Sequence, residues 1–107
     1  MAAQIEAILY VPVADNEGMA FGDTDWMELH ARLARVGNGA TRRGPHMGSW
    51  TAPDGVLCTE PVFEFEVAID SWFAVQGFLE TVRWTQSYFR QLAIHFKVAG
   101  IHETFPA

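Results

Sequence analysis

Cysteine is almost absent from this sequence, since Cys58 is the only one in 107 residues. A lone cysteine excludes an internal disulfide and a zinc site built from several cysteines. Basic residues are also scarce, because seven Lys and Arg stand against thirteen Asp and Glu, for a net charge of −6. A general nucleic-acid binder needs a basic surface to displace counterions, so this balance argues against nucleic acid as a partner.

Long apolar runs are missing as well. No stretch of the sequence approaches the roughly 20 apolar residues that a membrane-spanning helix needs. Residues 1–6 lack the basic and then apolar build of a signal peptide. We therefore expect no membrane partner and a cytoplasmic location.

The sequence is rich in apolar side chains, which make up 50% of its residues, while only 19% are charged. This composition is typical of a globular protein. The length predicts one α+β domain over residues 1–107. Such a small domain has difficulty hiding so many apolar side chains in one core, which favours a partner surface or a ligand pocket.

Periodicity and turn residues predict six elements. They are a strand over 5–13, a helix capped by Asp25 and ended by Gly37, a strand around 47–51 after a break at Gly44-Pro45, a strand over 56–69, a helix from 72 to about 92 with Asp70 or Ser71 as its cap, and a strand over 94–98. Gly100 is expected to end the last strand before a short tail.

This order of elements predicts a ferredoxin-like βαββαβ fold. In that arrangement a four-stranded, mainly antiparallel sheet carries two helices on one face. The first and third strands are expected to lie side by side at the centre, with the last strand next to the first.

Several short motifs follow one another along the chain. They are Leu9-Tyr10-Val11-Pro12, Gly39-Ala40-Thr41, Gly48-Ser49-Trp50, the run from Gly55 to Pro61 that reads Gly-Val-Leu-Cys-Thr-Glu-Pro, and Phe89-Arg90-Gln91-Leu92-Ala93-Ile94. In order and spacing they resemble a group of small, uncharacterised bacterial ferredoxin-like domains. The size and style of the chain also resemble proteins carried on mobile gene cassettes. The resemblance implies the ferredoxin-like fold and no particular activity.

Polar residues on one face of the predicted sheet form the first candidate site. Strand parity places Tyr10 between a carboxylate, Glu64 or Glu66, and the imidazole of His95. Such a group could bind a polar ligand or support acid–base chemistry. The alternative is a solvated face with weak ion pairs. Trp50 is expected beside Tyr10 at any pocket.

The second predicted helix is apolar on two sides. One stripe belongs to the core. The opposite stripe consists of Phe73, Gly77, Trp84 and Tyr88. Because Trp and Tyr are enriched in interface hot spots, we predict a homodimer contact there. The alternative is that loops of the same chain cover these rings.

Metal, cofactor and nucleophile signals are weak. The four histidines, His30, His46, His95 and His102, show no metal-binding spacing, so neither a metal nor a cofactor is predicted. Nothing local activates Cys58 as a nucleophile. The pair Arg42-Arg43 forms a small local basic patch whose role the sequence does not define.

The leading interpretation is an uncharacterised small homo-oligomeric binding module for a small molecule or a protein partner. The alternative is a small cofactor-independent enzyme, of isomerase or oxygenase type, with the Glu/Tyr/His face as its site. A third interpretation is an antitoxin-like or regulatory partner of another protein. The sequence does not decide whether the protein is an enzyme.

Overall fold

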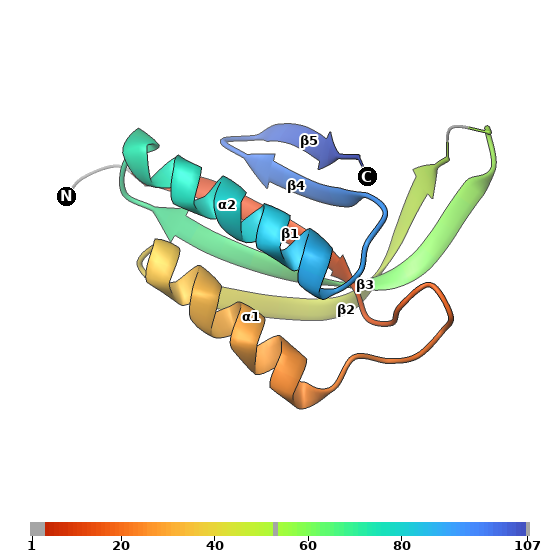
Figure 1. Ribbon diagram of the computed structural model, residues 1–107. Coiled ribbons are helices and arrows are strands. Elements are labelled where there is room, and N and C mark those ends of the chain that lie inside the picture. The colour runs from red at the N-terminus through yellow and green to blue at the C-terminus, as the bar shows by residue number, and fades with distance from the viewer. Residues whose placement is uncertain (1–3, 53, 107) are drawn as a thin grey trace.

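A computed structural model describes residues 4–52 and 54–106. Residues 1–3, part of the N-terminal stretch discussed above, lie outside the described residues. Two helices cover one face of a single antiparallel sheet, whose strand order is β2-β3-β1-β4-β5 (Figure 1). The elements are β1 (Ile5–Pro12), α1 (Asp23–Val36), β2 (Ala40–Thr51), β3 (Leu57–Ile69), α2 (Trp72–Tyr88), β4 (Ile94–Val98) and β5 (Ile101–Phe105).

The fifth strand overturns the predicted fold class. The protein is α+β, but the four-stranded ferredoxin-like βαββαβ prediction is wrong, because β5 extends the sheet beyond β4. Ala99 and Gly100 have φ values of 52° and 82°. Two successive positive φ values are typical of the tight turns that join hairpin strands. Gly100 therefore turns the chain back, and Val98 pairs with Ile101 across the turn.

The core lies between the helices and one face of the sheet. Alternate residues of β1, β3 and β4 point into it and meet the apolar stripes of both helices. Its largest fully buried side chains include Leu9, Phe65, Ile69 and Ile94 of the strands, Leu29 and Leu33 of α1, and Phe78 and Val82 of α2. This packing leaves the opposite face of the sheet, called here the open face, without a helix over it (Figure 1).

Capping groups set the ends of the helices. The cap of α1 is Gly22 rather than Asp25, whose carboxylate lies in the first turn and accepts the Gly22 N–H at 2.9 Å. The cap of α2 is Ser71, one of the two predicted residues, and its Oγ accepts the Ala74 N–H at 3.2 Å. Because α2 ends at Tyr88 and not near residue 92, residues 89–93 form a loop beside the sheet.

In the described part of the chain, neither helix has the length and apolar character needed to cross a membrane.

Candidate functional site

A bulge in β2 decides which side chains reach the open face. The strand is continuous over Ala40–Thr51, and the predicted break at Gly44-Pro45 is a bulge in which these two residues oppose Phe63 alone. Gly44 has a φ of 106°, which a residue with a side chain rarely adopts. One extra residue reverses the parity of a strand, so Trp50 lies on the open face although Arg42 lies on the helix face.

The β2–β3 hairpin extends past the rest of the sheet (Figure 1). Between its outer half, the open face and the loop after α2 lies a cavity of about 470 Å³. It is lined by Tyr10, Pro12, Asn16, Gly48, Ser49, Trp50, Glu60, Val62, Gln91, Leu92, Ala93, His95, His102 and Thr104. Its size falls within the usual range of ligand sites, about 300–1,000 Å³.

Tyr10 stands at the centre of the open face. The strand register pairs it with Glu64 on one side and His95 on the other, as strand parity predicts. The rings of Tyr10 and His95 are 5.4 Å apart between centroids. Burial, and then the negative charges of Glu64 and Glu6, raise the pKa of the Tyr10 phenol. The phenol is therefore a neutral hydrogen-bonding group at physiological pH.

His95 joins the cavity to β5 through two hydrogen bonds. Its Nδ1 lies 2.9 Å from the Thr104 hydroxyl, and its Nε2 lies 2.9 Å from Nδ1 of His102. The two imidazole rings are stacked, with centroids 5.1 Å apart. Burial, and then the proximity of His102, lower the pKa of His95. A neutral imidazole has one donor and one acceptor nitrogen, and these two hydrogen bonds engage both nitrogens of His95 and fix its ring in the cavity wall.

Glu60 lies beside Trp50 at the hairpin end of the cavity. Burial raises the pKa of the half-buried Glu60 carboxyl, while a hydrogen bond from the Trp50 side chain acts in the opposite direction. Trp50 is 47% exposed, a large fraction for an indole. This end of the cavity thus offers an aromatic ring and a carboxyl group with an elevated pKa.

The predicted site residues divide into two groups. Tyr10, Trp50 and His95 line the cavity, whereas Glu64 and Glu66 lie on the open face outside its lining. Glu66 accepts a hydrogen bond from Arg43 at 2.6 Å, and Glu64 lies 3.7 Å from His46. Whether any of these residues binds a ligand stays a prediction.

The predicted basic patch does not form as one surface. Arg43 reaches Glu66 on the open face, whereas the guanidinium of Arg42 lies 4.7 Å from the centroid of the Phe63 ring on the helix face. Neighbouring residues of a strand point to opposite faces of the sheet, which explains the separation.

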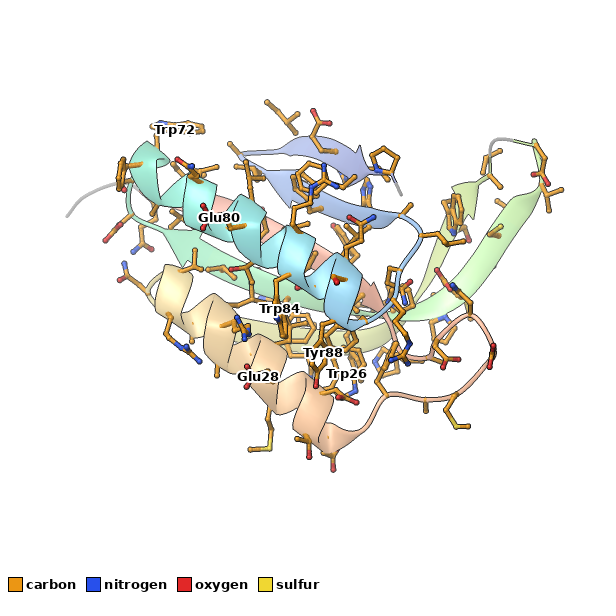
Figure 2. The ribbon with its side chains drawn as sticks, viewed as in Figure 1. Trp26, Glu28, Trp72, Glu80, Trp84 and Tyr88 are labelled. Atoms are coloured by element: carbon orange, nitrogen blue, oxygen red, sulfur yellow. The ribbon has the colours of Figure 1, made fainter. Side chains whose placement is uncertain are left out.

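Two of the predicted interface residues contact α1 of the same chain. Figure 2 shows Trp84 and Tyr88 reaching from α2 toward α1. The Tyr88 hydroxyl donates to Asp25 at 2.8 Å, and the Arg32 guanidinium lies 3.9 Å from the centroid of the Trp84 ring.

The other two interface residues differ in their surroundings. A Cβ added at Gly77 would lie 3.9 Å from Val36, so this glycine also faces α1. Phe73 is 90% exposed. The homodimer contact through the four residues stays a prediction, with Phe73 the ring that the chain itself leaves uncovered.

The polar residues of the cavity that sequence reasoning missed include Glu60, His102 and Thr104. Glu60 has the same parity as Glu64, but Pro61 lies between them, and a proline in a strand often marks a bulge that breaks the parity. The other two residues lie on β5, which was taken for a tail. In the ranges 4–52 and 54–106, no three His, Cys, Asp or Glu side chains are placed to hold a metal ion.

No protein-family model matches this chain, and no curated protein matches it. Among solved structures, it is similar to a phage SAM lyase in complex with S-methyl-5′-thioadenosine, with a TM-score of 0.78 and 13% identity over 100% of this chain and 92% of that chain. It is also similar to a phage SAM lyase in the apo state, with a TM-score of 0.62 and 17% identity over 96% of this chain and 89% of that chain. At these identities the likeness establishes a shared fold and nothing about the site.

Proposed function

We propose that this protein binds a small adenosine-containing thioether or sulfonium in the open-face cavity. S-methyl-5′-thioadenosine and S-adenosylmethionine (SAM) represent this class. The observation that carries the proposal is the cavity itself, which has about 470 Å³ and is lined by aromatic and polar side chains. Further support comes from the fold, which is shared along the whole chain with a phage SAM lyase in complex with S-methyl-5′-thioadenosine.

The chemistry of the cavity suits both members of the class. S-methyl-5′-thioadenosine has a flat purine ring and an apolar thioether, and the rings of Trp50 and Tyr10 can contact both. The sulfonium of SAM is a cation. Aromatic faces and carboxylates attract cations, and Glu64 lies directly beside Tyr10 on the open face.

Calorimetric titration with S-methyl-5′-thioadenosine and with SAM tests this function. Trp50→Ala is expected to weaken binding about 5- to 150-fold, because stacking of a base on an aromatic ring is worth about 1–3 kcal/mol. Trp72→Ala is the matched control. Trp72 is 70% exposed and does not line the cavity. It lies at the N-terminal end of α2, away from Tyr88 (Figure 2). The proposal fails if neither ligand binds, or if both variants lose the same affinity.

A second candidate function is cleavage of SAM, and one observation favours it. Tyr10, Glu60 and His95 line one cavity, and the pKa of each group is shifted by burial. Shifted titratable groups in a cavity are typical of active sites. When a carbon–sulfur bond of a sulfonium breaks, its electron pair stays on sulfur to give a neutral thioether, while the carbon gains an oxygen nucleophile or loses a neighbouring proton to a base. Such an enzyme needs no redox cofactor, which accords with the cofactor-independent alternative predicted from the sequence.

Incubation with SAM and chromatographic detection of S-methyl-5′-thioadenosine distinguish an enzyme from a binding module. An enzyme converts many equivalents of SAM, and Tyr10→Phe or His95→Gln is expected to slow the conversion. SAM that is bound and recovered unchanged would rule out this second function and leave the first intact.

Homo-oligomer formation and a cytoplasmic location also remain proposals from the sequence. The exposure of Phe73 supports a contact between copies. Light scattering is expected to show a wild-type dimer that Phe73→Asp converts to a monomer. A monomeric wild-type protein would contradict the dimer.

A further inference from the structure

The hairpin end of the cavity has a glycine, Gly48, beside an aromatic ring and a carboxyl group. Gly48 pairs with Glu60 across the two strands, and Trp50 follows two residues later on the same face. A Cβ at Gly48 would lie 3.4 Å from both methyl groups of Val62. Because Gly48 has no side chain, the surface beside Trp50 stays open for a planar group.

Trp50 and Glu60 are arranged to contact one planar ligand in two ways. Glu60 lies diagonally across the strands from Trp50, within reach of an aromatic side chain. Both side chains line the cavity, so this carboxyl lies on the same wall as the indole. A ring stacked on the indole therefore brings its own edge close to the same carboxyl.

Resting on the function proposed above, we propose that Trp50 and Glu60 form an adenine subsite. The purine stacks on the indole, and its N1 and N6 atoms pair with the carboxyl group of Glu60. The opposite end of the cavity, with Tyr10 and the hydrogen-bonded pair His95 and His102, then receives the sulfur-bearing end of the ligand.

The donors and acceptors of adenine determine which form of Glu60 fits. Adenine presents an acceptor at N1 and a donor at N6. A protonated carboxyl offers one donor and one acceptor and so matches this edge, whereas a carboxylate offers acceptors alone. Burial raises the pKa of Glu60 and thereby extends the range in which the matching form exists.

Other titratable groups lie near Glu60, on the open face or at its loop edge. They are Tyr10 on β1, His46 on β2, Glu64 on β3, His95 on β4, His102 on β5, and the pair of Asp15 and Arg90 at the loop edge. A pH effect must therefore be assigned to Glu60 through a variant and not by its midpoint alone.

Glu60→Gln separates these contributions, because the amide offers one donor and one acceptor at every pH. Calorimetry with S-methyl-5′-thioadenosine, from pH 5 to pH 8, supplies the readout. The wild-type protein is expected to bind this ligand about tenfold more tightly at pH 5 than at pH 8, because the carboxylate loses one bond of a matched pair that is worth about 1–3 kcal/mol. Glu60→Gln is expected to bind it with the same affinity throughout the range, and Glu60→Ala to bind it weakly throughout.

Glu103→Gln is the matched control, since Glu103 is exposed on β5 and does not line the cavity. It should behave as the wild-type protein does. Equal affinity of the wild-type protein at pH 5 and pH 8, or the same pH dependence in Glu60→Gln, would overturn the adenine subsite while leaving the proposed function standing. Failure of the wild-type protein to bind S-methyl-5′-thioadenosine or SAM at any pH would overturn both.

Discussion

The side chain of Gln86 connects α2 to two walls of the cavity. Its Nε2 donates to the carbonyl oxygens of Leu92 at 3.3 Å, Phe105 at 3.3 Å and Pro106 at 3.1 Å. Its Oε1 accepts from Arg83 at 3.2 Å, and the Arg83 guanidinium lies 3.7 Å from the centroid of the Phe105 ring. This one amide therefore holds the end of β5, the strand that presents His102 and Thr104 to the cavity.

Gln86→Leu keeps the bulk of the side chain and removes these bonds. An amide NH₂ has two N–H groups, and each net hydrogen bond contributes about 0.5–1.5 kcal/mol, for a sum of about 1–3 kcal/mol. The acceptor distances are long and two of the bonds are exposed to water, so we expect a loss of about 1–2 kcal/mol. At about 4 °C per kcal/mol for a domain of this size, Tm falls by about 4–8 °C.

Gln76→Leu is the matched control, because Gln76 is an exposed glutamine on the same helix. Urea unfolding measures the free energy, and hydrogen exchange locates the change. In Gln86→Leu, the amides of β5 are expected to lose protection while those of β1 and β3 keep theirs. If the two variants have equal stability and equal protection of β5, the role assigned to Gln86 is wrong.

Two further predictions concern stability. A Cβ at Gly37 would collide with the Ala68 carbonyl oxygen and lie 2.7 Å from a methyl group of Val67, so Gly37→Ala should cost about 1–3 kcal/mol; an unchanged urea midpoint would contradict this close approach. Because the pKa of His95 is lowered by folding, the unfolded chain binds its proton more tightly, and the stability contributed by His95 is complete above the ordinary value of 6.5 and falls as pH drops below it. As pH is lowered from 8 to 5, the urea midpoint of His95→Gln should fall less steeply than that of the wild-type protein. Identical slopes would refute the role of His95 in this pH dependence.

The sequence predicts the two helices and four of the strands because their apolar periodicity is strong. It did not predict β5, since Gly100 was taken for the end of the sheet and not for a turn residue. The decisive signal was the alternation on both sides of Ala99-Gly100, which indicates a hairpin once the two residues are allowed positive φ values.

The candidate site was harder to predict than the fold. Parity along regular strands correctly places Tyr10 beside Glu64 and His95. Parity fails at the β2 bulge. The sequence shows a break at Gly44-Pro45, but it does not show that two residues oppose Phe63 there, and this number decides which face the following residues occupy. The contact between Trp50 and Glu60 depends on that number.

The parity of the strands also separates the residues that stabilise the fold from those that line the cavity. Along β1 and β3, odd-numbered residues such as Leu9 and Phe65 pack against the helices, whereas even-numbered residues such as Tyr10 and Glu60 face the open side. Substitutions on the open side can therefore change the cavity with little cost to the core. A fold shared at 13% identity with a phage SAM lyase is compatible with a quite different ligand, and the ligand must be inferred from this chain's own open-face residues, Trp50 and Glu60 above all.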